Sequence, residues 1–349
     1  MNMKKFFTCT AAVAGVALFS VSAFAEEAGG TPSLSIFGDA YAGVQTTESG
    51  EGPGGNIYAL TDGENAQNGF GINWLGLDAA YDGGAWGVTG SLRFGDAVAI
   101  YGTGSLGPVT QAYVTWRPSD KLTLDLGTFG TIYGAEVAEN WANLNYTRGA
   151  LYFNLQPFWH TGLRAEYADG DWVARALVVN DANTSLLGTS ALNLGLQGGY
   201  DNGAFGIVAG VLQSTKPELA GFVDTFVDVV VTANAGDLSI IGNFDFNAGT
   251  DTAAFVGGSL AAGYSFSPTF GAAVRGEFIS VEAGEDEDDN TRFTATLTLD
   301  FKPTGSDNFM IRWDNRVESA NTDAFGAGDD ATSTWFGSTL GFVAYADLL

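Results

Sequence analysis

The sequence predicts an all-β protein: a transmembrane, antiparallel, up-and-down β-barrel of about sixteen strands, with fourteen or eighteen strands also compatible. Three observations lead to this prediction. Apolar and polar residues alternate along run after run of the chain. Short and long connections between these runs also alternate. The composition combines 49 Gly, 25 Phe, 12 Tyr and 8 Trp with only 15% charged residues. No stretch of about twenty apolar residues follows the N-terminal region, which argues against membrane-spanning helices.

The first 25 residues have the features of a secretory signal peptide. Lys4 and Lys5 form a charged start, "AAVAGVALFSV" is the apolar middle, and "SAFA" is a small-residue cleavage site before Glu26. We therefore expect residues 1–25 to be removed and residues 26–349 to form one barrel domain. Because Cys9 would leave with the signal peptide, we expect no disulfide or thiol chemistry in the exported chain.

The charge of the chain restricts its partners. The formal net charge is −26, with 40 Asp and Glu against 14 Lys and Arg. This charge repels nucleic acid, and no basic patch interrupts it. We expect no nucleic-acid partner and no cofactor.

Residues 81–96, "YDGGAWGVTGSLRFGD", illustrate the strand pattern. After the turn residues, the apolar side chains Trp86, Val88, Leu92 and Phe94 alternate with small or polar ones, among them Arg93. A strand with this pattern has one apolar and one polar face. In a membrane barrel the apolar face contacts lipid and the polar face a wet lumen.

The connections between strands decide between a membrane barrel and a soluble β-protein. Tight turns such as Asp82-Gly83-Gly84 and Asp169-Gly170-Asp171 alternate with much longer polar stretches, so the long loops gather at one end. Outer-membrane barrels have short periplasmic turns and long external loops. A secreted β-sandwich or β-solenoid is the alternative, but it has no reason to put every long loop at one end.

The two faces of the strands differ in charge. The face expected to contact lipid is apolar on strand after strand, and we assign Trp159 and Leu163 to it. The opposite face carries nearly all the strand charge, which cannot be packed into a dry core unless each group is paired. We predict that this face lines a water-filled pore. Its charged residues include Arg93, Arg164, Arg175, Arg275, Arg292, Arg312, Arg316, Asp125 and Asp314.

The long connection at residues 131–150 mixes aromatic with polar side chains and would be poorly placed in open water. We predict that it folds into the lumen and narrows the pore, where its charges would select by size and charge. The alternatives are an outward lid, or a loop that packs on a neighbouring subunit. The residues expected at the constriction are Glu136, Glu139, Trp141, Asn145, Tyr146 and Arg148.

Other motifs carry weaker signals. His160 is the only histidine. A barrel hydrolase could use it, but no local signature supports a catalytic pairing, so we expect no enzyme, no catalytic residue and no metal site. "GTGSLG" at 102–107 precedes a strand rather than a helix, which argues against a nucleotide site. The acidic stretch 282–290 lacks the spacing of a Ca²⁺ loop and is expected to be a solvated loop, with weak divalent-cation bridging as the alternative.

One stretch resembles a known family. Residues 111–167 are similar to the β-barrel porins of the OmpL-like porin-2 group, in which "G.F.T..G.E" leads to "N.NY.R" and then to "PF.HTG.R". The matching residues here are Gly127, Phe129, Thr131, Gly134, Glu136, Asn143, Asn145, Tyr146, Arg148, Pro157, Phe158, His160, Thr161, Gly162 and Arg164. The resemblance implies an outer-membrane barrel and suggests passive transport.

Together these features predict an outer-membrane porin of Gram-negative type, through which small hydrophilic solutes and ions diffuse with modest cation selectivity. A structural or adhesive barrel without conductance is the first alternative, and a barrel hydrolase using His160 is the second. The expected partners are outer-membrane lipid and lipopolysaccharide, periplasmic chaperones and the barrel-assembly machinery. A homotrimer is the oligomer we consider.

Overall fold

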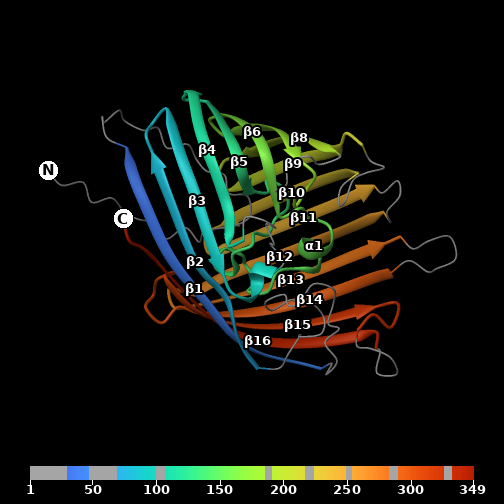
Figure 1. Cartoon of the computed structure of the whole chain (residues 1–349). Coiled ribbons are helices and arrows are strands. Elements are labelled where there is room, and N and C mark those ends of the chain that lie inside the picture. Colours follow the sequence, from blue (N-terminus) through green and yellow to red (C-terminus); the bar gives the residue numbers. More distant parts are fainter. Residues whose placement is uncertain are drawn as a thin grey trace.

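The computed structural model describes residues 30–46, 69–99, 107–184, 191–216, 224–248, 254–282, 290–325 and 332–349. Sixteen strands form one closed barrel (Figure 1). The strands are β1 (Thr31–Gln45), β2 (Gly69–Asp82), β3 (Trp86–Phe94), β4 (Val109–Ser119), β5 (Leu122–Gly130), β6 (Trp159–Asp169), β7 (Trp172–Asn180), β8 (Leu192–Asp201), β9 (Phe205–Ser214), β10 (Thr225–Ala235), β11 (Leu238–Ala248), β12 (Phe255–Ser267), β13 (Phe270–Val281), β14 (Asn290–Phe301), β15 (Phe309–Ala320) and β16 (Thr334–Asp347).

Every strand pairs in antiparallel orientation with its neighbours in sequence, and β1 pairs with β16 to close the barrel. The closing register runs from Ser35 opposite Asp347 to Gln45 opposite Gly337. Closure leaves no sheet edge with unpaired backbone groups, which a protein in lipid requires. The predicted all-β, antiparallel, sixteen-stranded barrel is confirmed.

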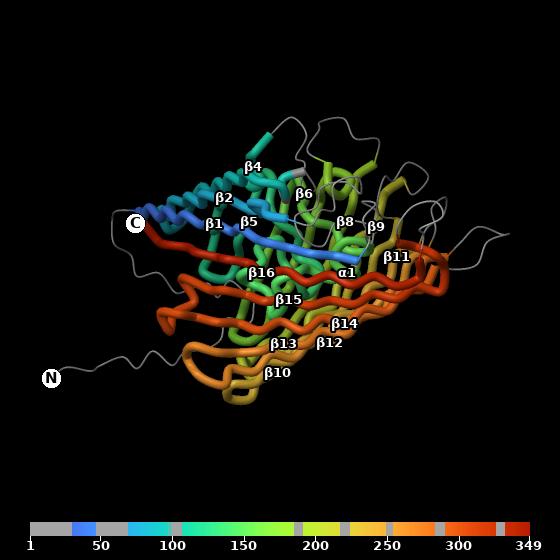
Figure 2. The backbone as a smooth tube through the Cα atoms, turned by 90° about the horizontal axis from the view of Figure 1, so that it is seen from below, coloured from blue at the N-terminus to red at the C-terminus, as the bar shows by residue number. Residues whose placement is uncertain are grey.

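The connections alternate in length as the sequence predicts. Those from an even-numbered strand to the next are short, and the C-terminus lies at their end of the barrel (Figure 2). Gly170 and Gly236 have φ of 60° and 62° in two of these turns. Such positive φ values favour glycine and match the twist of two-residue hairpins.

The outer surface is apolar. On β3, Trp86, Val88 and Phe94 are 51%, 45% and 46% exposed, whereas Ser91 and Arg93 are 2% and 3% exposed. The same alternation continues along β7 and β8. The phase predicted for residues 86–94 is therefore correct, with apolar side chains outward and polar ones inward.

The connection between β5 and β6 is longer than the predicted 131–150. It covers residues 131–158 and is called the lumen segment below. It contains a short 3₁₀ turn (η4, Asn140–Ala142) and one helix, α1 (Ala150–Asn154). Of the helices in the described residues, none is long and apolar enough to span a membrane.

The assignment of Trp159 to the lipid face is wrong. Its side chain is 4% exposed and packs inside the barrel with Phe37, Trp74 and Tyr152. Gly162 has a φ of 156°, and both Trp159 and His160 are buried, so the outward alternation begins only at Leu163. An aromatic side chain can face inward here because the lumen segment provides apolar partners for it.

Three predictions fall outside the described residues. They are the signal peptide at 1–25, nearly all of the acidic stretch 282–290, and most of the "GTGSLG" motif. They remain predictions.

Candidate functional site

The lumen segment crosses the interior of the barrel and contacts the wall on several sides (Figure 1). Its carbonyl at Ile132 accepts a hydrogen bond from Gln197 of β8 at 2.6 Å, and Glu139 pairs with Arg93 of β3 at 2.8 Å. Tyr146 contacts Asp39 of β1. The fold into the lumen that the sequence favours is thus the arrangement found.

The segment buries most of the charged side chains that the sequence places on the inner face. Arg93, Arg175, Arg275, Arg312 and Arg316 are between 1% and 6% exposed. Asp125 and Asp314 are 4% and 1% exposed, and Arg164 and Arg292 are partly buried. All of them face inward, but many contact the segment or other wall residues.

Strand register pairs several of these charges. Arg164 lies directly opposite Asp125, and their side chains are 2.7 Å apart. Arg175 is opposite Glu166 at 2.6 Å, and Arg312 is opposite Asp300 at 2.7 Å. Opposite charges at directly paired positions stabilise neighbouring strands and satisfy groups that would be costly to bury alone.

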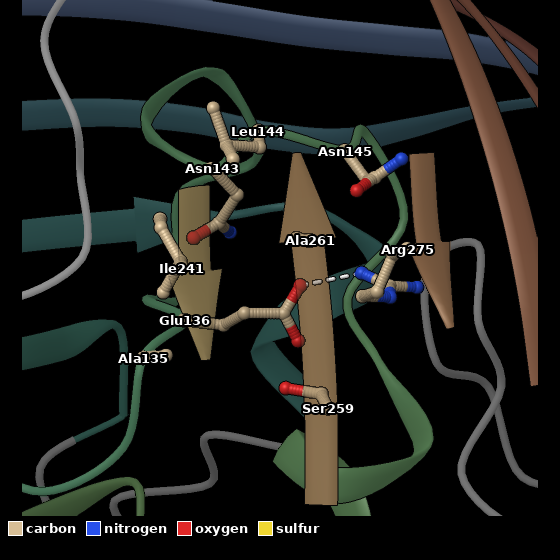
Figure 3. Close-up of a pocket in the computed structure, with 9 residues that line it drawn as sticks. All are labelled: Ala135, Glu136, Asn143, Leu144, Asn145, Ile241, Ser259, Ala261 and Arg275. Carbon is tan, nitrogen blue, oxygen red and sulfur yellow. Dashed lines mark hydrogen bonds and ion pairs between the residues drawn. The ribbon is translucent and has the colours of Figure 1, made fainter. Parts of the chain in front are cut away.

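Arg275 of β13 is at the centre of the contact between wall and segment (Figure 3). It pairs with Glu136 of the segment at 2.5 Å and with Glu277 of its own strand at 3.0 Å, and it donates to the carbonyl of Thr147 at 2.7 Å. Burial raises the pKa of the Glu136 carboxyl, and Arg275 opposes that shift.

A cavity of about 20 Å³ lies beside this ion pair. Its polar lining includes Glu136, Asn145, Ser259 and Arg275 (Figure 3). The Oδ1 atom of Asn145 is buried there without a hydrogen-bond partner, while its amide donates to Thr298 at 2.8 Å. The space fits about one water molecule.

The arginines of β15 hold the segment by its backbone. Arg312 donates to the carbonyls of Asn140, Asn143 and Leu144 at 2.5, 3.0 and 2.8 Å, and Arg316 donates to the carbonyl of Arg148 at 2.8 Å. A planar guanidinium has enough donors to satisfy several carbonyls at once.

Asp314, which lies between these two arginines on β15, accepts hydrogen bonds from the segment. The backbone N–H of Thr147 donates to it at 3.3 Å and the Thr147 hydroxyl at 3.0 Å. Along the segment, Thr147 lies between the three carbonyls that Arg312 contacts and the Arg148 carbonyl that Arg316 contacts. These contacts fix the segment's path along this strand.

Tyr146 and Arg148 are fully buried. Burial, and the Asp39 carboxylate beside it, raise the pKa of the Tyr146 phenol, so its hydroxyl keeps the proton that it donates. Arg148 makes no ion pair with a described residue. It donates to Asn140 Oδ1 at 2.8 Å and to the Ala138 carbonyl, and its guanidinium lies 5.6 Å from the ring centre of Phe153. Trp141 packs against Phe37, with ring centres 4.3 Å apart.

Glycines of the barrel wall form notches that hold the segment's side chains. A Cβ at Gly341 would lie 2.3 Å from the Tyr146 ring, one at Gly257 2.5 Å from Leu151, and one at Gly195 2.5 Å from the Tyr133 hydroxyl. Any larger residue would force the segment to move. The wall and the segment are therefore complementary in shape.

His160 is completely buried and lies 3.1 Å from the Thr131 hydroxyl. The rings of Phe129 and Tyr133 lie about 6 Å from it. It makes no ion pair within the described ranges, and among those residues no group of three His, Cys, Asp or Glu side chains could hold a metal ion.

Sequence reasoning missed Asn243, which accepts from the segment, and Glu318, which pairs with Arg316 in full burial. It placed Asp39 and Glu277 on the inner face but did not foresee that both bind the segment. The alternation along each strand predicts that these side chains face inward. It does not predict which residues they bind, because most of those residues belong to the lumen segment, which is distant in sequence.

The comparisons with known proteins agree with this architecture. The family model described as "Putative beta-barrel porin-2, OmpL-like" matches residues 35–345. The chain belongs to this family. It is an outer-membrane β-barrel of porin type, as the resemblance at residues 111–167 implies. Among curated proteins, no sequence matches significantly.

Solved outer-membrane proteins share the fold of this porin-2 member. An anion-selective porin from Comamonas acidovorans matches with a TM-score of 0.62 and 13% identity, over 91% of this chain and 100% of that chain. OmpT expressed in the outer membrane of Vibrio cholerae matches with a TM-score of 0.61 and 12% identity, over 93% and 99%. A trimer form of in-vitro folded OmpT matches with a TM-score of 0.60 and 14% identity, over 91% and 100%. At these identities the likeness concerns the fold.

Proposed function

We propose that this barrel is a porin through which small hydrophilic solutes and ions pass by passive diffusion. The observation that supports this most is the contrast between an apolar outer face and an inner face lined by Arg, Asp and Glu on strand after strand. The apolar outer face suits contact with lipid, and the charged inner face suits contact with an aqueous passage. The passage would run between the lumen segment and the wall, where the cavity beside Glu136 and Arg275 lies.

Modest cation selectivity is part of this proposal. The chain carries 40 acidic and 14 basic residues, and a field of that sign concentrates cations at the mouth. At the segment, Glu136 and Glu139 compensate the charges of Arg275 and Arg93. Without these two carboxylates the narrow region would be more positive.

A second candidate is a structural or adhesive barrel without conductance. The burial of five of the seven predicted pore arginines favours it, because a fully hydrated lumen would leave them exposed. Catalysis by His160 finds no support in its surroundings, where its hydrogen-bond partner is a threonine hydroxyl.

The proposed partners follow from the location. The outer belt would contact lipid and lipopolysaccharide, and chaperones with the barrel-assembly machinery would insert the chain. A homotrimer is proposed by analogy with the trimer form of Vibrio cholerae OmpT.

Single-channel recording in a planar bilayer tests the proposal. A porin gives stepwise conductance, and the reversal potential under a KCl gradient gives the sign of its selectivity. A protein that inserts, as shown by heat-modifiable migration in a detergent gel, but gives no current at any voltage would support the structural barrel instead.

A further inference from the structure

Two buried aspartates face each other inside the barrel, and neither has an ion-pair partner among the described residues. Asp228 of β10 is the direct register partner of Asp245 of β11, and both are 0% exposed. Their carboxyl groups lie side by side, because both accept a hydrogen bond from the same Nδ2 atom of Asn243. Neither makes an ion pair with any described residue, although most other inward-facing acids described above do.

Within the described strands, the register row through the pair contains no Lys or Arg. The row of register partners through it reads Gln197, Gly210, Asp228, Asp245, Gly257 and Ile279 across β8 to β13. Along β10 and β11, the inward neighbours are Phe226, Val230, Asn243 and Asn247. From the lumen segment, the titratable groups near the pair are the Tyr133 phenol and Glu136, and Glu136 is paired with Arg275.

The lumen segment docks on this pair and seals it. The backbone N–H of Ala135 donates to Asn243 Oδ1 at 2.8 Å, and Nδ2 of the same asparagine donates to both aspartates. The two flanking glycines make room for the segment, since a Cβ at Gly210 would lie 2.7 Å from the Tyr133 ring and one at Gly257 2.5 Å from Leu151.

The hydrogen bonds leave one oxygen of each carboxyl unused. Asn243 Nδ2 donates to Oδ1 of Asp228 at 2.9 Å and to Oδ1 of Asp245 at 3.0 Å. The Oδ2 atoms of both aspartates are buried and have no hydrogen-bond partner. Two adjacent carboxylates removed from water cannot both stay ionised, because repulsion and lost hydration act together. One proton shared by the two carboxyl groups removes the repulsion and lowers the cost of the lost hydration, as in other close carboxyl pairs.

We propose that Asp228 and Asp245 form a proton-binding site, and that docking of residues 133–136 of the lumen segment on the β10–β11 wall depends on the proton it holds. The docked state holds one more proton than the undocked state, in which both carboxylates contact water. Raising the pH therefore favours undocking, and the docking equilibrium shifts by up to about tenfold per pH unit.

Thiol labelling tests this site without reference to conduction, so its outcome is separate from that of the proposed porin function. Ala135 is 5% exposed when docked. In a Cys9→Ser background, Ala135→Cys should react slowly with a water-soluble thiol reagent at about pH 6 and several-fold faster at about pH 9, after correction for the ionisation of the thiol itself. The correction comes from a cysteine at Ala204, which is exposed in the β8–β9 turn outside the strands, in the same background.

Neutral variants then locate the effect. Asp245→Asn and Asp228→Asn each remove one ionisable group and keep an amide of similar shape, so labelling at position 135 should lose its pH dependence. Asp125→Asn is the matched control, because this buried aspartate is paired with Arg164, and the pH dependence should remain. Heat-modifiable migration reports whether each variant folds.

Three results would overturn the proposal. One is corrected labelling that does not change with pH in the parent. Another is a pH dependence that persists in a folded Asp245→Asn or Asp228→Asn variant. The third is labelling that is insensitive to pH but suppressed by added CaCl₂ or NaCl at constant ionic strength, since that would identify a metal cation as the occupant.

Discussion

Tyr146 of the lumen segment donates a 2.7 Å hydrogen bond to Oδ1 of Asp39 on β1, a residue 107 positions earlier in the chain. The other carboxylate oxygen of Asp39 accepts from Asn73 of β2 at 2.6 Å. The Tyr146–Asp39 hydrogen bond therefore links the lumen segment to β1, which pairs with β16 to close the barrel. On the opposite wall, Tyr133 donates to the Val211 carbonyl at 2.9 Å. The segment is therefore held across the lumen by two tyrosines.

Tyr146→Phe should destabilise the barrel by about 1–3 kcal/mol, because a buried carboxylate loses one of its two side-chain donors. Urea unfolding in detergent micelles, followed by tryptophan fluorescence, measures the change. Tyr264→Phe is the control, since that ring is on the outer face. Equal stabilities of the two variants would contradict the role of the Asp39 contact.

Gly341→Ala should displace the segment from β16. The added Cβ would lie 2.3 Å from the Tyr146 ring, and overpacking of this kind costs about 1–3 kcal/mol. Gly276→Ala is matched to it, because a Cβ there meets nothing within 4 Å. A lower thermal midpoint for Gly341→Ala alone is the expected result, and a midpoint equal to that of Gly276→Ala would argue against the notch.

Leu126→Arg tests the lipid-facing belt. Leu126 is at the middle of β5 and is 64% exposed, so an arginine there should cost about 2–4 kcal/mol in a bilayer. Ala174→Arg, near the turn end of β7, should cost about 0–1 kcal/mol because the interface is close. Unfolding free energies in phospholipid vesicles give both values. Similar costs at the two positions would contradict the membrane orientation.

The strand part of this fold was readable from the sequence because it depends on local periodicity. Trp86, Val88 and Phe94 show the phase of β3 without knowledge of any neighbour. The turn residues Gly170 and Gly236 mark where the chain reverses. Alternating loop lengths then give the number of strands and the end at which the short turns gather.

The interior could be predicted only in part. The composition of residues 131–150 favoured insertion into the lumen, but Trp159 read like the start of a lipid-facing strand. Periodicity cannot separate an aromatic side chain facing lipid from one facing a segment inside the barrel. Gly257 and Gly341 likewise read as ordinary strand glycines, because their notches exist only once Leu151 and Tyr146 are in place.

Glu136→Gln combined with Glu139→Gln should reduce cation selectivity even in concentrated salt. Each substitution removes a carboxylate from an ion pair, with Arg275 in one case and Arg93 in the other, and leaves the guanidinium less compensated. Charges at this depth are screened less than those at the mouth. The reversal potential under a KCl gradient should therefore move toward the anion side at both low and high salt.

The acidic stretch provides the comparison for this prediction. If this stretch forms the external loop that the sequence predicts, neutralising Glu285 to Asp289 should lower cation selectivity only in dilute salt, because screening acts over about 10 Å at 0.1 M and about 3 Å at 1 M. Glu136→Asp with Glu139→Asp keeps both charges and should keep most of the selectivity. If the unmodified protein were anion-selective, the arginines of the wall would control the passage, and the two glutamates would not lie at its narrowest point.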